Sequence, residues 1–231
     1  MKRATLTKNP GDVSSMFDEV ASKYDVTNTV LTGGLIYVWR SAVKQALEIT
    51  PGKRILDLAA GTGSSSKVYQ DAGAEVICCD FSVGMMTTGQ ERHPDLTFIA
   101  GDGMALPFAD ETFDAVTISY GMRNIKDSDQ ALRELYRVTK PGGTLVVCEF
   151  SRPTNKVFRE LYNFYLGTVM PAITRRVSSD AVAYDYLMES ILKWPPQEEF
   201  AERVQAAGWR DVEYRNITNG VVALHRATRP L

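Results

Sequence analysis

A short glycine-containing turn between a strand-like run and a helix-like run is suited to holding a nucleotide. Residues 55–63 read Ile-Leu-Asp-Leu-Ala-Ala-Gly-Thr-Gly. Glycine lets a ligand approach the backbone where a Cβ would collide, and the helix that follows offers unpaired N–H groups. Gly61, Thr62 and Gly63 are therefore candidate cofactor-binding residues. The turn matches the dinucleotide pattern G-x-G-x-x-G/A only in part, and an ordinary strand-to-helix turn has a similar composition.

A carboxylate at the end of the next strand-like run fits the same chemistry. Asp80 closes the run 75–80 and lies 17 residues after Gly63. There it can accept hydrogen bonds from both ribose hydroxyls of an adenosine ligand, and it would repel the 2′-phosphate of NADP. The alternative role of Asp80 is to cap the helix that begins after Phe81 and Ser82.

The elements that must position these residues alternate along the chain. Apolar runs typical of strands buried on both faces are expected at 54–58, 75–80, 96–100, 113–119 and 144–150, with helices at 64–71, 83–92 and 129–139 between them. Two further runs, 212–216 and 221–226, are joined by a segment ending in Asn219-Gly220, a pair that supplies the positive φ angles of a hairpin. This pattern predicts an α/β fold, a doubly wound and mostly parallel seven-stranded sheet that ends in an antiparallel hairpin.

The 231 residues are expected to form one domain, because no Pro-, Ser- or Gly-rich linker interrupts them. Residues 1–50 are predicted to be an N-terminal helical cap, and residues 156–207 a helical insertion broken at Pro171 and at Pro195-Pro196. The chain has 26 Lys and Arg against 28 Asp and Glu, a net charge of −2. A global basic field for binding nucleic acid is therefore absent.

The cysteines and the apolar runs indicate a cytoplasmic protein. Three cysteines, two of them adjacent at positions 78 and 79, make no disulfide framework. The longest uncharged apolar-rich runs, 26–39 and 161–174, have 14 residues each, short of the roughly 18 that span a bilayer. With two histidines and cysteines placed in strands, no metal-ligand spacing is present.

Four motifs follow one another in order over residues 54–150. They are the turn 57–63, the loop 101–108 (Gly-Asp-Gly-Met-Ala-Leu-Pro-Phe), Phe113-Asp114 and the segment 137–143 (Arg-Val-Thr-Lys-Pro-Gly-Gly). This set resembles the class I S-adenosylmethionine-dependent methyltransferases. The resemblance implies S-adenosylmethionine as cofactor, with Asp102 at the adenine amino group, the backbone of Gly103 at the ring, and Ser119 in contact with the cofactor. Ala60 departs from the family pattern, in which many members have a glycine or a cysteine.

Further motifs lie largely outside the cofactor region. They include Lys23-Tyr24-Asp25-x-x-Asn28, the segment 118–125 (Ile-Ser-Tyr-Gly-Met-Arg-Asn-Ile), the segment 149–153 (Glu-Phe-Ser-Arg-Pro) and the segment 220–225 (Gly-Val-Val-Ala-Leu-His). With them, nearly the whole chain resembles the demethylmenaquinone/ubiquinone C-methyltransferases of quinone biosynthesis. Thr27, Thr32 and Ile36-Tyr37 depart from that family's pattern, which leaves the detail of the substrate entrance open.

This resemblance implies methylation of a ring carbon of a polyprenylated demethylmenaquinol to give menaquinol. The alternatives are a methyltransferase acting on another phenol or lipid, including the ubiquinone precursor, and an NAD-linked oxidoreductase. A protein that binds the cofactor without turnover is a further alternative that only an assay excludes.

A carbon nucleophile of this kind forms when a neighbouring ring hydroxyl loses its proton, and a cation near that oxygen stabilises it. Arg123 is the candidate catalytic residue for this role, acting through electrostatics or water orientation because arginine stays protonated. A salt bridge to an acid such as Asp127 is the structural alternative. Asn124 is a candidate hydrogen-bond partner of a quinone oxygen. Tyr24, Asp25 and Asn28 are candidate residues of a lid, with Tyr24 and Asn28 as candidate substrate-binding residues and core packing as the alternative for Tyr24.

His225 can be read as a base, but a hydrogen-bonded structural histidine is the favoured interpretation. No role is assigned to His93.

A polyprenyl tail is insoluble in water, so such a substrate must be taken from a bilayer. The stretch 157–170 is apolar and aromatic, and it is flanked by cations at 156, 159, 175 and 176. This composition suits transient peripheral contact with the inner face of an anionic membrane. The alternatives for the stretch are a buried helix that covers the active site and a homodimer contact.

Overall fold

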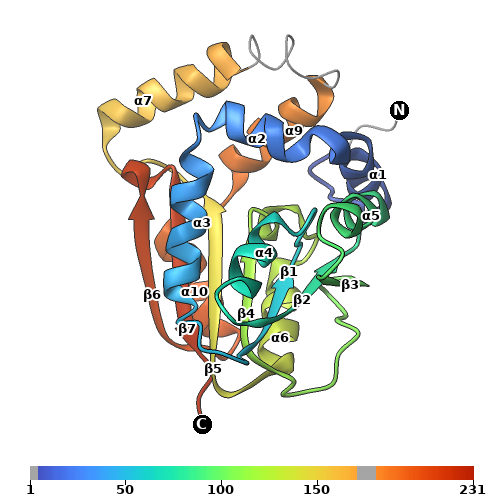
Figure 1. Ribbon diagram of the computed structural model, residues 1–231. Helices are drawn as coiled ribbons and strands as arrows, with labels where there is room; N and C mark the ends of the chain where they lie inside the picture. The colour runs from blue at the N-terminus through green and yellow to red at the C-terminus, as the bar shows by residue number, and fades with distance from the viewer. Residues whose placement is uncertain (1–4, 171–180) are drawn as a thin grey trace.

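Seven strands form one sheet in the order β3-β2-β1-β4-β5-β7-β6 (Figure 1). The computed structural model describes residues 5–170 and 181–231. The strands β1 to β5 pair in parallel, whereas β7 runs antiparallel to both β5 and β6. The predicted sheet, mostly parallel with an antiparallel end, is therefore confirmed. The strands are β1 (Arg54–Leu58), β2 (Glu75–Asp80), β3 (Thr97–Ala100), β4 (Phe113–Ser119), β5 (Thr139–Phe150), β6 (Arg210–Ile217) and β7 (Val222–Thr228).

The strand order reverses between β1 and β4, and this reversal locates the site. β2 and β3 lie on one side of β1, while β4 and the later strands lie on the other. At such a switch point the connections leave in opposite directions, so a crevice opens at the carboxyl ends of the strands. The turn 57–63, Asp80 and Ser119 all lie at these carboxyl ends.

Helices cover both faces of the sheet, which explains why its strands are apolar throughout. On one face lie α3 (Leu35–Ala46) and α4 (Ser64–Gln70), with Trp39 and Tyr69 buried against the strands. On the other lie α6 (Ser128–Val138) and α10 (Gln197–Ala206), which bury Leu135 and Phe200. Helix α5 (Val83–Arg92) packs beside α1 and β3.

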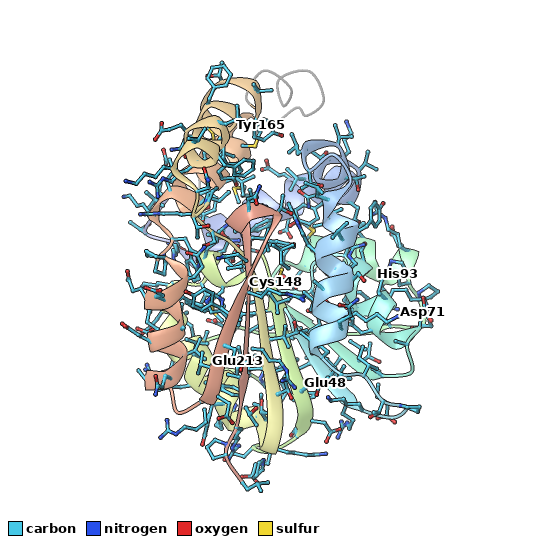
Figure 2. All side chains as sticks on the ribbon, turned by 90° about the vertical axis from the view of Figure 1, so that its left-hand side faces the viewer. Glu48, Asp71, His93, Cys148, Tyr165 and Glu213 are labelled. Atoms are coloured by element: carbon cyan, nitrogen blue, oxygen red, sulfur yellow. The ribbon has the colours of Figure 1, made fainter. Side chains whose placement is uncertain are left out.

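The remaining helices gather beyond the carboxyl ends of the strands, at the top of Figure 1. The Tyr165 hydroxyl donates a hydrogen bond to the Leu31 carbonyl at 2.7 Å, which joins η3 to α2. Figure 2 shows Tyr165 at this end and Cys148 lower, within the sheet. Across residues 5–170 and 181–231, no helix is both long and apolar enough to cross a membrane. The helices of this end are α1 (Pro10–Val20), η1 (Ala21–Lys23), α2 (Tyr24–Leu31), α7 (Lys156–Phe164), the π-helical turn η3 (Tyr165–Val169) and α9 (Ala181–Lys193).

The structure refines the two helical regions expected from the sequence. Within the first fifty residues, α3 belongs to a layer against the sheet, while α1 and α2 lie over its edge. Within 156–207, α10 also packs on the sheet, and Pro195-Pro196 separates it from α9 as expected. Pro171 lies outside the described residues.

Several boundaries also differ from the predicted ones. β5 begins at Thr139 instead of 144, because Thr139 already pairs with Phe113 of β4. The connection between β6 and β7 is a 3₁₀ turn, η4 (Thr218–Gly220), in which Asn219 and Gly220 have φ angles of 54° and 87°. The positive φ angles expected of the Asn-Gly pair are thus present.

Candidate active site

Two adjoining cavities lie where the carboxyl ends of the strands meet the overlying helices. The smaller cavity has a volume of about 300 Å³ and the larger cavity one of about 600 Å³. Because several residues line both, the cavities share a wall, and ligands bound in the two would be neighbours. The shared residues are Phe17, Tyr24, Asn28, Ile36, Tyr120 and Asn124.

The smaller cavity collects most of the candidate cofactor residues. They lie at the carboxyl ends of β1, β2, β3 and β4 or in the connections that follow. These segments are far apart in the sequence, and the sheet brings them together. Gly63 is the exception, because it does not line the cavity. Its φ angle is +74°, and a Cβ there would lie 2.8 Å from the Phe98 ring, so its glycine serves the turn itself. The candidates that line the smaller cavity are Gly61, Thr62, Asp80, Asp102, Gly103 and Ser119.

Asp80 holds the glycine turn in place and still faces the cavity. One carboxylate oxygen accepts the backbone N–H of Gly61 and the other that of Ser82, each at 2.8 Å. Burial raises the pKa of Asp80, and these backbone donors partly oppose that effect. A carboxylate has about four acceptor positions, so ribose hydroxyls can be bound in addition to the two N–H groups. Capping of α5 falls to the neighbouring Ser82, whose Oγ accepts the Met85 N–H at 3.2 Å.

The loop after β3 lines a further part of the smaller cavity. One oxygen of Asp102 accepts the Met104 N–H at 2.9 Å. Gly103 is buried, and a Cβ at this position would lie 3.0 Å from Ile125 Cδ1 and 3.3 Å from Leu58. This loop therefore presents backbone and a carboxylate to the cavity, an arrangement compatible with a nucleobase.

Asp25 fastens the overlying helix α2 to the glycine turn, a role that the sequence did not reveal. Its carboxylate accepts hydrogen bonds from the Thr62 hydroxyl at 2.8 Å and the Ser64 hydroxyl at 2.9 Å. Arg92 of α5 completes the cluster with an ion pair at 2.6 Å. The motif Lys23-Tyr24-Asp25 marked this segment, but nothing in it named the partners.

Asp57, the residue before the last one of β1, is a second residue that the sequence analysis did not single out. It lines the smaller cavity, is 2% exposed, and accepts a hydrogen bond from Ser66 Oγ at 2.6 Å. Burial raises its pKa to about 7, with the Ser66 bond lowering it and the charge of Asp80 raising it further. A buried carboxylate with such a pKa changes its charge near neutrality.

The larger cavity is mainly apolar and takes in the candidate substrate residues. Tyr24, Asn28 and Asn124 lie on its shared wall, and Arg123 lines the larger cavity alone. Asn124 is partly committed within the protein, since its Oδ1 accepts the Tyr186 hydroxyl at 3.2 Å. Aromatic and aliphatic side chains form most of the rest, including Trp39, Phe150, Phe158, Tyr162, Tyr165, Leu166, Met170 and Ile191.

Arg123 is buried and paired, although not with the acid suggested by the sequence. Its Nη1 lies 2.7 Å from Glu149 Oε1, and it also donates to the Tyr120 carbonyl. Asp127 instead caps α6, accepting the Gln130 N–H at 2.9 Å. The Arg123 guanidinium lies 5.2 Å from the centre of the Phe150 ring, and its Nε has no hydrogen-bond partner among the described residues.

His225 lies on β7, away from both cavities. Its Nε2 is 2.9 Å from the Gln197 carbonyl, and its ring packs against Phe200 and Tyr214. Burial lowers its pKa, which keeps the ring neutral. These contacts correspond to the structural interpretation of this histidine.

Comparison with known proteins places the chain among methyltransferases. Residues 4–229 match the ubiE/COQ5 methyltransferase family. A demethylmenaquinone methyltransferase of Streptomyces griseus is 58% identical over 229 residues, covering 99% of this chain and 100% of the relative. One from Renibacterium salmoninarum is 56% identical, covering 98% of this chain and 96% of the relative.

Solved structures share the fold at low sequence identity. A chain in the complex of the Haloferax volcanii Trm112 methyltransferase activator has a TM-score of 0.66 and 21% identity, covering 93% of this chain and 98% of that one. The Haemonchus contortus phosphoethanolamine N-methyltransferase 2, in complex with S-adenosyl-L-methionine, has a TM-score of 0.62 and 17% identity, covering 83% of this chain and 52% of that one. These likenesses identify the sheet as that of class I methyltransferases.

Replacing Asp57 with asparagine should change how the free energy of unfolding depends on pH. The folded-state pKa of about 7 lies above the ordinary value of 3.8, so the contribution of Asp57 is fully present below pH ~4 and is lost as the pH rises through ~7. The difference in unfolding free energy between the native protein and Asp57→Asn should therefore shift in favour of the variant by up to about 4 kcal/mol over this range. Urea unfolding at a series of pH values measures it. Asp71→Asn, at an exposed acid, is the control, and a difference that stays constant with pH would contradict the assignment.

Proposed function

This chain belongs to the ubiE/COQ5 methyltransferase family, and we propose that it transfers the methyl group of S-adenosylmethionine to a ring carbon of a polyprenylated demethylmenaquinol, producing menaquinol. The observation that carries this proposal is the pair of cavities with a common wall. A cavity edged with carboxylates and glycines adjoins a mainly apolar one that contains a buried arginine. The first suits a charged nucleoside donor and the second a ring with an apolar tail.

The residues of the smaller cavity fit an adenosyl ligand. Gly61 has a φ angle of +56° and open space where a Cβ would point, so a ligand can approach its backbone. Asp80 would hold the ribose hydroxyls and Asp102 the adenine amino group, with Gly103 against the ring. Asp57 would supply negative charge close to the cationic end of the donor. When bound, S-adenosylmethionine would supply an activated methyl group: the C–C bond forms as the C–S bond breaks, the electron pair of that bond stays on sulfur, and the ring proton is then lost to water.

In the larger cavity, Arg123 would stabilise the acceptor oxygen after its hydroxyl proton is lost. Arginine keeps its charge at any working pH, and this guanidinium is buried at the wall of the larger cavity. Tyr24, Asn28 and Asn124, on the shared wall, would orient the ring toward the donor. Orientation and exclusion of water can supply several kcal/mol of the barrier, so the protein needs no covalent intermediate.

The apolar tail implies contact with a lipid bilayer, and helix α7 is suited to it. Val157, Leu161 and Phe164 form one outward face and are 81%, 62% and 58% exposed. The opposite face, with Phe158 and Tyr162, lines the larger cavity. Helix α2 has a related arrangement, since Val26 is exposed and Asn28 and Leu31 line the cavity. Val30 does both, because it is 48% exposed and also lines the cavity. The walls of the substrate cavity thus continue into an exposed apolar surface, with cations at Lys156 and Arg159 beside it.

The catalytic proposal is tested by incubating the protein with methyl-labelled S-adenosylmethionine and a demethylmenaquinol, followed by mass analysis of the quinol. We expect one labelled methyl group on the ring. The ubiquinone precursor and a simple naphthol, assayed in parallel, distinguish a naphthoquinol enzyme from one that methylates phenols generally. An unlabelled demethylmenaquinol, in a preparation that still binds S-adenosylhomocysteine, would refute the proposal.

Asp80→Ala should weaken binding of S-adenosylhomocysteine by about a hundredfold or more. The change removes charge-assisted hydrogen bonds to the ribose, each worth roughly 1.5–3 kcal/mol. Isothermal titration calorimetry measures the affinity, and Asp71→Ala serves as the exposed control. Because Asp80 also holds Gly61 and Ser82, thermal unfolding of the variant is recorded alongside. An unchanged affinity would overturn the ribose assignment.

Membrane contact is tested by flotation with vesicles that contain phosphatidylglycerol, at low salt. The double variant Leu161→Ser/Phe164→Ser should reduce the bound fraction several-fold, because it removes apolar area from the face of α7. Leu231→Ser is the matched control, since Leu231 is also exposed but ends the chain at the opposite end of the molecule (Figure 1). Equal flotation of all three proteins, or no flotation of the native one, would contradict the membrane proposal.

A further inference from the structure

Glu149 is a buried acid that touches neither cavity, yet it holds Arg123 in two places. It is 1% exposed and lies near the end of β5. One oxygen accepts Arg123 Nη1 at 2.7 Å and the Phe150 N–H at 2.8 Å. The other accepts the backbone N–H of Arg123 at 3.2 Å. The same carboxylate therefore fixes both the backbone and the guanidinium of Arg123.

Within residues 5–170 and 181–231, the hydrogen bonds of the guanidinium use only one of its nitrogens. Nη1 serves Glu149 and the Tyr120 carbonyl. Nε is buried without a hydrogen-bond partner among the described residues, and Arg123 lines the larger cavity. The guanidinium carbon also lies 5.2 Å from the centre of the Phe150 ring. An arginine held by one nitrogen presents its remaining N–H groups in a fixed direction, as recognition of an oxygen ligand requires.

The pKa shifts of the tyrosines that line the larger cavity indicate how Arg123 and Glu149 act on a phenol there. Burial raises the pKa of Tyr24 and of Tyr162, while the charge of Arg123 lowers both. At Tyr186 burial again dominates, and the lowering by Arg123 is greater than the raising by Glu149. Arg123 thus acts more strongly than Glu149 on Tyr24, Tyr162 and Tyr186. At Tyr120, which lines both cavities, burial raises the pKa most and Glu149 raises it further.

We propose that Glu149 is a positioning residue for methyl transfer, which holds Arg123 so that its free N–H groups meet the oxygen of a bound phenolate acceptor. This inference rests on the function proposed above. Glu149 itself does not touch the acceptor. Its carboxylate compensates the buried guanidinium, which would otherwise be an unpaired charge, and keeps it from turning toward other acceptors.

The test is Glu149→Gln, compared in the same assay with Asp114→Asn. Asp114 is a matched control, because its carboxylate also accepts a backbone N–H, from Arg54, and pairs with a cation, Lys140. It lies at the amino-terminal end of β4, whereas Glu149 lies at the carboxyl-terminal end of β5. A glutamine offers only one oxygen to the three donors that Glu149 serves, so Arg123 loses its fixed orientation. We expect kcat to fall by about tenfold or more with Glu149→Gln, while KM and the affinity for S-adenosylhomocysteine change little and Asp114→Asn stays near native.

The direction of a pH shift separates positioning from a simple loss of charge. If Glu149 positions Arg123, its removal weakens phenolate stabilisation, and the acid limb of the kcat profile moves to higher pH. If Arg123 stays in place without its anion, the limb moves to lower pH, which would overturn the proposal. Bound 1-naphthol, whose absorbance reports ionisation, gives the same readout without turnover. Its ionisation midpoint should rise in Glu149→Gln, and absence of naphthol binding to the native protein would overturn the acceptor site and this inference together.

A double-mutant cycle tests whether Glu149 acts through Arg123. Arg123→Lys alone should lower turnover more than it lowers cofactor affinity. When Glu149→Gln is added to Arg123→Lys, kcat should change by no more than about a further twofold. Additive losses would overturn the proposal. Glu149→Asp, which keeps the charge, should recover part of the activity and covers the case in which Glu149→Gln folds poorly. If the native enzyme methylates the quinol and Glu149→Gln is unaffected, only this inference fails; if the native enzyme makes no product, the proposed function fails first.

Discussion

The site depends on keeping charged groups away from water without leaving them uncompensated. Asp57, Asp80, Arg123 and Glu149 are between 1% and 6% exposed. Burying an ion costs several kcal/mol unless hydrogen bonds or an opposite charge replace its water. Here backbone N–H groups of the strand ends, the Ser66 hydroxyl and the ion pair between Arg123 and Glu149 take that role. Because these partners belong to the sheet and its connections, the polar groups are fixed before any ligand arrives, which is the arrangement that favours electrostatic catalysis.

The fastening of helix α2 is of a different kind from these buried pairs. The ion pair between Asp25 and Arg92 is about one-third exposed, so water screens it and it contributes little to stability. Its value is geometric, since the same carboxylate reaches Thr62 and Ser64 beside the glycine turn. Helix α2 also carries Tyr24 and Asn28, which belong to both cavities. The wall between donor and acceptor is therefore supported by contacts that cost little to break and reform.

Periodicity and turn chemistry predicted the sheet, because each strand is defined by residues next to one another in the chain. The same reasoning picked out Asp80 and the glycine turn, since a carboxyl-terminal strand end is a local feature, whereas Asp102 came from the resemblance to methyltransferases. It assigned the wrong partner to Arg123, because Glu149 is 26 residues away and adjoins Arg123 only through the pairing of β4 with β5, in register from Ser119 and Cys148. The nearby Asp127 was the obvious acid in the sequence, but its position at the start of α6 commits it to that helix. Gly63 does not line the smaller cavity, and the sequence could not show this, since a turn glycine and a ligand-contacting glycine look identical in a sequence.

The two strand ends that flank the shared wall also hold unusual backbone conformations. Ala59, directly after β1, has a φ angle of 54°, and Tyr120, directly after β4, has one of 58°. Left-handed backbone at non-glycine residues costs of order 1–3 kcal/mol and persists only where the surroundings enforce it. The two turns are pressed together, because a Cβ at Gly121 would lie 2.4 Å from Ala59 Cβ. This close approach brings the end of β1 against the end of β4 beside the wall that the two cavities share, since Ala59 lines the smaller cavity and Tyr120 lines both. The strained backbone therefore lies where the two ligands must meet.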